Sequence, residues 1–535
     1  MPSSQATSQT KARGPLWELL VVAAPVVMTM ASYTIMQFVD ALMVTRIGPD
    51  EVYLAAQSNG GITMWLTIAA VLGGATVINT FVSQHLGAGR PERGASYAWA
   101  GVYLAAVWAL VMAPAIPFLG SVFELAGHEG RLLEIETEYA QILFGGAFFV
   151  LASRNLAHYF YGLHRPMVVM IAAFSGNLVN MVANAVLIFG IDGAPQGFPL
   201  RELWMSIAEG LGIEAMGVAG AAWGTVIGSA VELAIPVALF ISPGMERRYK
   251  TRSSWRISMR PVKDIVRVGW PGGLMLVSEL TCWSYLMVVL LPLAGKAAGE
   301  DPVIHNAAGW AALRYMHLSF MPVIGLQTAV TAVVGRYLGA RDKDTASARA
   351  WLGLKIGMVY MGVCAVAFVL LRYPMIALFA GERTPEEASE MIRIGASVMI
   401  AAAVFQVFDA MAIVMQGALR GAGDTVYPGV VTVITSWVFI VAGGHLLIEF
   451  APGLGSVGPW IGGAAYIISL GMLMTLRWMG GKWREIELVE EDAAASECLG
   501  AAEEAGTLPG LAPASPATRL EPKMRPLDAE ASKKL

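Results

Sequence analysis

The sequence is poor in charged residues and in cysteine, and each shortage excludes a class of protein. Only 14% of its 535 residues are charged, whereas soluble domains carry about 25%. Its three cysteines, Cys282, Cys364 and Cys498, are scattered and form no CxxC pair. This pattern argues against a disulfide framework and a structural zinc site. The net charge of −4 gives no electrostatic reason to expect a nucleic-acid partner.

Catalytic motifs are also missing from the sequence. The seven histidines are dispersed without an HExxH pair, and no G-x-x-x-x-G-K-[ST] phosphate loop is present. We therefore expect no enzyme and no resident cofactor. An ATP-driven pump would need a partner chain to supply the ATP-binding site.

Long apolar runs dominate the chain, which is 56% hydrophobic with a mean hydropathy of +0.59. A helix of about 20 apolar residues crosses the ~30 Å hydrocarbon core of a bilayer. The first run is too long, and too polar at its outer end, for a cleaved signal peptide. The sequence thus predicts an all-α integral membrane protein with twelve transmembrane helices. The runs cover 16–46, 54–83, 97–121, 138–161, 168–190, 216–241, 266–294, 305–334, 351–371, 391–417, 427–447 and 457–478.

An internal repeat divides these helices into two halves. Residues 76–101 align without a gap with residues 328–353, at an offset of 252, and share the loop triplet LGA. Because the offset contains six helices, the repeats have parallel topology. We therefore predict two pseudo-symmetric six-helix lobes around a central cleft. The predicted parts are an N-terminal tail (1–15), an N-terminal lobe (16–245), a basic linker (246–265), a C-terminal lobe (266–480) and a disordered tail (481–535).

The distribution of Lys and Arg predicts the orientation. The stretch ERRYKTRSSWRISMRPVKDIVR after the sixth run contains eight basic and two acidic residues, whereas loops on the opposite side are sparser in Lys and Arg and rich in acids. The positive-inside rule then places both termini in the cytoplasm. On that opposite side, the loop 191–215 is unusually long. We favour a surface insertion there over a short interfacial helix in LRELWMSIAEGL.

Four acids lie inside the apolar runs and away from their ends: Asp40, Glu232, Glu279 and Asp409. An ionised carboxylate at membrane depth costs at least about 3 kcal/mol, so each needs a cation, a proton or a polar partner. Glu279 and Asp409 lie at similar depths and could line one cavity. For Glu232 a cavity position and a packing role are equally favoured.

Structural pairing with a buried arginine is the alternative explanation for these acids. Arg314 lies well outward of Glu279 and Asp409. Arg154 is expected to extend toward the inner headgroups instead of pairing. A scaffold protein would have no reason to place several acids in apolar helices, and an embedded enzyme would need a clustered catalytic set.

Three asparagines, Asn177, Asn180 and Asn184, share one face of the fifth run because they are spaced by three and four residues. Their carbonyl oxygens suit a small cation. Hydrogen bonding between helices is the alternative. An acid such as Asp40, which needs a partner, favours the ligand interpretation.

Several segments together resemble the multidrug and toxic compound extrusion (MATE) transporters, in particular the NorM-like branch. They extend over residues 15–485 in the order and spacing of that family. The segments are PVVMTMASYTIMQFVDALMV, HLGAGRPERG, NLVNMVANAVLIFG, MGVAGAAWGT, YLGARDKD, FDAMAIVMQGALRGAGDT and LRWMGGKW.

The resemblance implies two sites. The family's N-lobe cation site falls on Asp40, Asn180, Asn184 and Thr225. The glutamate and aspartate of its C-lobe fall on Glu279 and Asp409. It also implies secondary antiport, in which protons or sodium ions enter while amphipathic, often cationic, organic compounds or drugs leave.

The coupling ion stays open between H⁺ and Na⁺, because some relatives have an aspartate at the position of Asn184. An apolar setting disfavours a charged carboxylate, so we lean toward protons at Asp40. Sodium could bind there or between Glu279 and Asp409.

A flippase or exporter of lipid-linked compounds or polysaccharides is the alternative. It would need several cations for phosphate in its cleft. We expect a monomer in the bilayer of a bacterial inner membrane, with no nucleic-acid partner.

Overall fold

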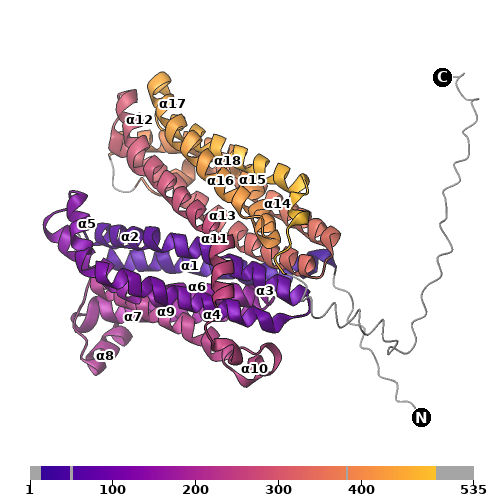
Figure 1. Ribbon diagram of the computed structural model, residues 1–535. Coiled ribbons are helices and arrows are strands. Elements are labelled where there is room, and N and C mark those ends of the chain that lie inside the picture. The colour runs from indigo at the N-terminus through magenta and orange to yellow at the C-terminus, as the bar shows by residue number, and fades with distance from the viewer. Residues whose placement is uncertain (1–13, 49–51, 381–383, 490–535) are drawn as a thin grey trace, which may run out of the picture. The chain divides into compact units, whose positions relative to one another are not determined.

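The computed structural model describes residues 14–48, 52–380 and 384–489, and within these ranges every regular element is a helix (Figure 1). Twelve of the helical segments are long and apolar enough to cross a membrane. This confirms the predicted all-α membrane fold with twelve spans. Adjacent α-helical and 3₁₀- or π-helical pieces often make up one span, because a local change of helix type bends the helix without ending it.

The N-terminal lobe contains six spans. The first is the single helix α1, and the second is split into α2 and α3 at Thr76. Its elements are α1 (Pro15–Val44), α2 (Val52–Ala75), α3 (Val77–Gly87), η1 (Pro91–Arg93), α4 (Gly94–Met112), η2 (Ala113–Phe118), α5 (Leu119–Leu125), α6 (Gly130–Gly162), α7 (Pro166–Phe189), η3 (Gly190–Asp192), α8 (Arg201–Leu211) and α9 (Val218–Phe240).

The C-terminal lobe repeats this plan after a linker that contains α10 and η4. Two of its spans contain a π-helical segment, η5 and η6. The elements are α10 (Pro243–Tyr249), η4 (Ser253–Trp255), α11 (Met259–Tyr285), η5 (Leu286–Leu290), α12 (Leu291–Ala298), α13 (Pro302–Gly339), α14 (Lys343–Ala377), α15 (Pro385–Ala422), α16 (Val426–Thr435), η6 (Ser436–Ala442), α17 (Gly443–Phe450), η7 (Pro452–Leu454), α18 (Val457–Met479) and η8 (Lys482–Glu485).

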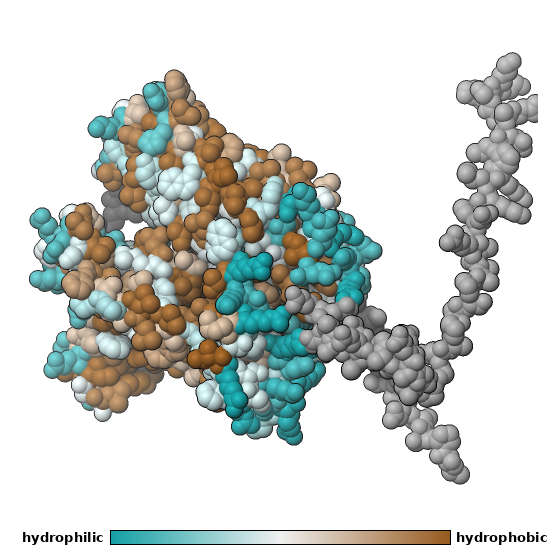
Figure 2. All heavy atoms as spheres, in the orientation of Figure 1, coloured by the Kyte–Doolittle hydropathy of each residue, from teal (hydrophilic) through white to brown (hydrophobic). Residues whose placement is uncertain are grey.

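The even number of spans puts the start of α1 and the end of α18 at the same end of the helices. We call this the terminal end and the opposite one the outer end. Figure 2 shows apolar residues over the flanks and hydrophilic residues gathered near α10, at the terminal end. Such a belt is what a bilayer-spanning protein presents to lipid.

The lobes meet near the terminal end through a reciprocal pair of glycines. A Cβ built on Gly87 would lie 1.9 Å from the carbonyl oxygen of Arg336, and one built on Gly339 would lie 2.0 Å from that of Gln84. Both pairs are related by the repeat offset, since 339 − 87 and 336 − 84 are each 252. The shared LGA triplet therefore places the same glycine on each side of one pseudo-symmetric contact, where only glycine lets the backbones approach so closely.

A second pair of glycine contacts lies deeper, about 21 Å from Gly87 along the helices. A Cβ on Gly73 in α2 would lie 2.3 Å from the Gly272 carbonyl oxygen in α11, and one on Gly325 in α13 would lie 2.9 Å from the Val27 Cα in α1. Gly73 and Gly325 again differ by 252. The contact surface between the lobes, which we call the seam, thus repeats with the sequence.

Polar contacts support the seam on the side nearest the terminal end. The side chains of Asn79, Thr80 and Gln84 donate to C-lobe carbonyl oxygens at 2.9–3.1 Å. Across from them, Glu18 accepts from Arg349 at 2.8 Å and from Tyr337 at 2.7 Å. These bonds satisfy buried polar groups at the point where the two lobes exclude water.

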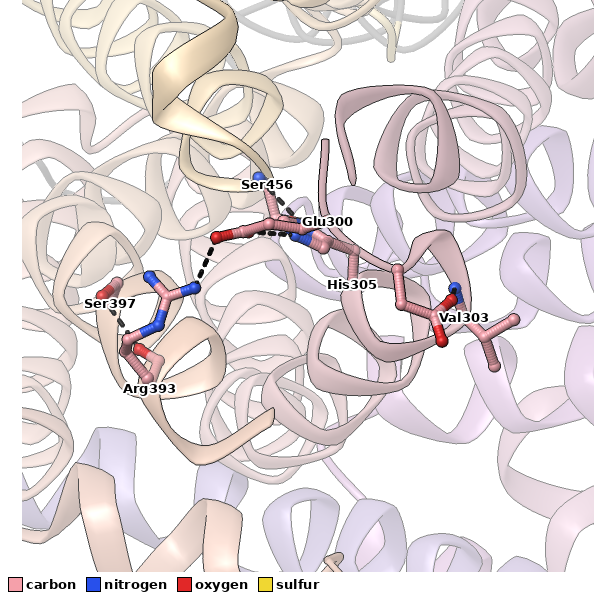
Figure 3. A network of polar contacts seen from close by, with 7 residues as sticks. Glu300, Val303, His305, Arg393, Ser397 and Ser456 are labelled. Atoms are coloured by element: carbon pink, nitrogen blue, oxygen red, sulfur yellow. Dashed lines mark hydrogen bonds and ion pairs between the residues drawn. The ribbon is translucent and has the colours of Figure 1, made fainter. Parts of the chain in front are cut away.

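At the outer end, a polar network ties two loops of the C-terminal lobe to helices α13 and α15 (Figure 3). His305 at the start of α13 lies between Glu300 and Ser456, 2.6 Å from each. Arg393 of α15 donates to the same glutamate at 2.7 Å. Partial burial raises the pKa of Glu300, but the hydrogen bonds from His305 and Arg393 outweigh it and leave that pKa below its usual value. Ser456 is buried, so this network fixes loops and offers no accessible nucleophile.

Three boundaries differ from those predicted. The loop 191–215 contains a helix, α8, so the favoured surface-insertion interpretation was wrong: Gly212, at φ +64°, ends this helix as an αL cap. Helix α11 begins at Met259 and takes up part of the predicted linker 246–265. The fold continues past residue 480, because Trp483 is buried and stacks on Trp478 at 4.1 Å. The predicted tails 1–15 and 481–535 lie almost wholly outside the described residues.

Candidate ion and substrate sites

The predicted N-lobe residues lie together between α1, α7 and α9. Asp40 in α1 is 7% exposed, and its carboxylate accepts a hydrogen bond of 2.8 Å from the Asn184 amide nitrogen in α7. Asn184 lies 3.5 Å from the Asn180 carbonyl oxygen, and the Asn180 amide nitrogen lies 3.5 Å from the Thr225 hydroxyl in α9. Asp40, Asn184, Asn180 and Thr225 thus form one chain of polar contacts, which we call the N-site.

A glycine stripe on α9, which the sequence analysis missed, makes room for the N-site. A Cβ on Gly224 would lie 1.9 Å from the Asn184 carbonyl oxygen, and one on Gly228 would lie 2.7 Å from the Asn180 Cβ. With Gly220, these residues form a GxxxGxxxG pattern, the sequence signal that could have revealed the contact. The stripe brings α9 so close to α7 that the asparagine side chains lie against its backbone.

The asparagines also join helices, as the alternative interpretation expected. Asn177 donates to Ser32 in α1 at 2.6 Å, so α7 is bound to α1 at two levels. The carbonyl oxygen of Asn184 is buried and has no hydrogen-bond partner in the part of the chain that the structure describes. Such an orphan acceptor is costly in a packed interior. This oxygen is available to a proton donor or an ion.

A second polar group lies nearer the terminal end of the same lobe. Tyr33 of α1 donates to Glu232 of α9 at 2.5 Å. The guanidinium of Arg154 in α6 lies 3.7 Å from the same carboxylate and 3.8 Å above the Tyr33 ring. The expectation that Arg154 extends toward the headgroups was therefore wrong, because a carboxylate and an aromatic face hold it inside the lobe. Glu232, left open between two roles, has this pair as its partners.

In the C-terminal lobe, Glu279 of α11 accepts a hydrogen bond of 2.5 Å from the buried hydroxyl of Tyr466 in α18. The preceding residue, Ser278, lies 3.1 Å from the hydroxyl of Ser436 and accepts from the Trp437 indole at 3.1 Å. Ser436 and Trp437 begin the π-helical segment η6. Such segments often occur at functional sites because they re-aim side chains.

Asp409 of α15 lies within electrostatic range of Glu279. We call these two carboxylates, with Tyr466, the C-site. Asp409 is half-buried, and the structure gives it no hydrogen bond or ion pair with another described residue. Because their charges act on each other, both cannot easily carry a charge in an apolar setting unless a cation or a proton compensates.

Arg420 lies three residues beyond the predicted run 391–417 but still within α15, where its charge acts on Glu279. Only Arg314 was considered from the sequence as a basic partner for the C-lobe acids, and Arg420 is a second one. The positive charges of Arg420 and Arg154 both lie within electrostatic range of His158 in α6, so a cation from each lobe lies near the seam. The charge of Arg420 is opposed by Glu279, and the charge of Arg154 is opposed by Glu232.

No group of three or more His, Cys, Asp or Glu side chains that could hold a metal occurs in ranges 14–48, 52–380 and 384–489. The N-site offers one carboxylate with amide and hydroxyl oxygens, and the C-site offers two carboxylates. Both sets are hard oxygen ligands, suited to a passing proton or alkali ion.

A carboxylate site within the membrane-spanning helices of each six-helix lobe is typical of a two-lobed membrane transporter. The family described as MatE matches residues 25–186 and 275–444, one segment in each lobe and more than half of the chain. The chain belongs to this family.

Relatives extend the match over almost the whole chain. A probable multidrug resistance protein NorM from Shewanella oneidensis is 25% identical, covering 89% of this chain and 97% of its own length. The multidrug resistance protein MdtK of Proteus mirabilis is 26% identical, covering 89% and 98%. Among solved structures, a MOP superfamily transporter from Pyrococcus furiosus, described as having a binding pocket of reverse polarity, superposes with a TM-score of 0.75 at 22% identity. That match covers 89% of this chain and 98% of the other, and supports the fold.

The pair of Arg154 and Glu232 gives a stability prediction. Arg154→Met leaves Glu232 buried without its cation and is expected to cost up to roughly 3 kcal/mol, at the low end for a broken buried pair because Arg154 is partly exposed. Adding Glu232→Gln to the same protein should recover most of the loss, since no uncompensated charge is left. Thermal unfolding midpoints in detergent measure both. A double variant that is less stable than Arg154→Met would contradict the pairing.

Proposed function

We propose that this chain is a secondary active antiporter that exports amphipathic, cationic organic compounds in exchange for protons or sodium ions. The observation that carries the proposal is the presence of one carboxylate site inside the membrane-spanning part of each lobe, on helices that also form the seam. Asp40 is on α1 and Glu279 is on α11, the two helices that contact the other lobe through Val27 and Gly272. Movement of the lobes about the seam would therefore change the surroundings of both acids. The curated relatives described as multidrug resistance proteins agree with this function.

The chemistry of the C-site supports a cationic substrate. Glu279 and Asp409 provide negative charge, and Trp437, which donates to the neighbouring Ser278 and is 48% exposed, provides aromatic surface. Carboxylates beside aromatic rings suit organic amines, because the rings attract the cation through their faces and bury its apolar part. Broad acceptance of substrates follows from a site with few directional hydrogen bonds.

The geometry of the N-site supports protons at Asp40. The amide nitrogen of Asn184 faces the carboxylate. A sodium ion bound there would meet this donor where it needs an oxygen. Protonation of Asp40 needs no such rearrangement. Sodium remains suited to the C-site, where two carboxylates are available.

Exchange would proceed by alternating access, in which the lobes rock about the seam. An ion can drive this motion only if it binds one orientation more tightly than the other. Protonated Asp40 would favour one packing of α1 against α7, and the charged form would favour the other. Competition between substrate and ion for Glu279 and Asp409 would link binding to the same motion.

We infer that the terminal end faces the cytoplasm and that the protein acts as a monomer in a bacterial inner membrane. The orientation is supported by the cations of the linker, and the monomer by the presence of both lobes in one chain. The rival flippase function is less supported, because Arg154 and Arg420 are each opposed by an acid. A site for phosphate would need an excess of positive charge.

The C-site prediction concerns Glu279→Gln and Asp409→Asn. Either change removes one carboxylate and should reduce efflux of a cationic dye from proteoliposomes to the level of empty vesicles, while the protein stays folded. Glu386→Gln, at the exposed start of α15, is the matched control and should transport like the wild type. Wild-type rates in both C-site variants at equal reconstitution would show that these acids are not required.

The N-site prediction concerns the coupling ion. Substrate release from purified protein is measured while pH and sodium are varied separately at fixed membrane potential. Lowering the pH without sodium should release substrate from wild type and from the exposed control Asp192→Asn, but not from Asp40→Asn. If only sodium releases substrate, and pH between about 5 and 8 has no effect, the assignment of protons to Asp40 is wrong. A chain with no ion-driven efflux at all would contradict the antiporter itself.

A further inference from the structure

Helix α11 begins with a basic face that neither proposed site uses. Arg260, Lys263 and Arg267 are all exposed and spaced by three and four residues, so they share one face of the first turns of the helix. Together with Val262, Asp264 and Val266, they line a surface groove of about 690 Å³. The groove combines a cationic side with apolar walls.

The same face changes character further along the helix. Trp270 and Leu274 continue the spacing of three and four residues, and are 51% and 47% exposed. From Arg260 to Leu274 the face thus passes from cationic to aromatic to aliphatic over about 21 Å. This is the order in which a membrane presents phosphate, interface and hydrocarbon.

Two cations of the groove, Lys263 and Arg267, are available to a ligand. Lys263 and Arg267 form no hydrogen bond or ion pair with another side chain in the part of the chain that the structure describes. The single acid of the groove, Asp264, accepts a hydrogen bond of 2.8 Å from Tyr97 in α4, which holds its carboxylate toward the N-terminal lobe. One acid against three cations leaves the groove net positive.

We propose that this face of α11 binds an anionic phospholipid of the surrounding leaflet. Its phosphate would contact Lys263 and Arg267, and its glycerol region and acyl chain would lie along Trp270 and Leu274. Basic pockets beside membrane helices bind anionic headgroups, and each nearby Lys or Arg adds to the attraction. A lipid accounts for the whole face, whereas free phosphate would contact only the cations and would leave Trp270 and Leu274 without a ligand group to contact.

The bound lipid would act on the seam. The opposite face of α11 carries Gly269, Gly272 and Gly273, which touch the backbone of α2 at Ala70, Gly73 and Gly74. A lipid that orders the first turns of α11 would therefore favour one arrangement of the lobes and change the transport rate. This consequence rests on the proposed function, but the binding site does not.

Binding is tested with the purified full-length protein, titrated with short-chain phosphatidylglycerol or phosphatidylcholine and read by native mass spectrometry. Wild type should bind phosphatidylglycerol roughly tenfold more tightly than phosphatidylcholine. Lys263→Gln/Arg267→Gln should lose this preference. Arg247→Gln/Arg248→Gln, which removes the same charge from exposed positions of α10, should keep it.

Three outcomes would overturn the proposal: a wild type with no preference, an equal loss in the α10 control, or full competition by millimolar inorganic phosphate, which indicates a simple anion site. Trp270→Ala should weaken binding of both lipids by a similar factor, because it removes the interfacial contact without removing charge. If the double variant does not fold, the proposal is judged from the lipid preference of the wild type and from the loss of that preference in the single variant Lys263→Gln. The assay measures no transport, so a failure of the lipid site is distinguishable from a failure of the antiporter function.

Discussion

The fold depends on close contact between backbones that only glycine permits. At Gly87 and Gly339, and again at Gly73 and Gly325, a single added carbon would overlap the opposing helix. Inside a membrane no hydrophobic force drives helices together, so dispersion at short range and hydrogen bonds must hold them. The repeat supplies each contact twice, and the two lobes therefore meet through surfaces that are copies of one another.

The same principle arranges the interior of the N-terminal lobe. The glycines of α9 let α7 approach until Asn180 and Asn184 fill the space beside Asp40. A carboxylate held by neutral amides is sensitive to protonation, since the amides supply hydrogen bonds without supplying charge. Nearer the terminal end, Glu232 has a cation and a tyrosine as partners and so is suited to a structural role. One lobe thus contains one acid held by neutral groups and one balanced by charge.

Much of this was predictable from the sequence. Hydropathy located all twelve spans, the repeat located the lobes, and the polar positions Asp40, Asn180, Asn184 and Thr225 do lie together. The pairing of Arg154 with Glu232 was not predictable, because it depends on which faces of α6 and α9 meet. Arg420 fell outside the predicted run 391–417 because hydropathy falls near the end of α15, although the helix continues to Ala422. Helix α8 was considered in the sequence analysis but not favoured, because its 11 residues are too short and too polar on average to stand out by hydropathy.

The central claim is that the two lobes rock about the seam when Asp40 changes protonation. Spin labels at Leu125→Cys in α5 and Phe450→Cys in α17, exposed positions at the outer ends of the two lobes, report this motion once the native cysteines are replaced. The distance distribution between the labels should contain two populations whose ratio shifts between alkaline and acidic pH, and the shift should be absent in Asp40→Asn. A single distribution, unchanged by pH and by substrate in protein that still transports, would contradict the account.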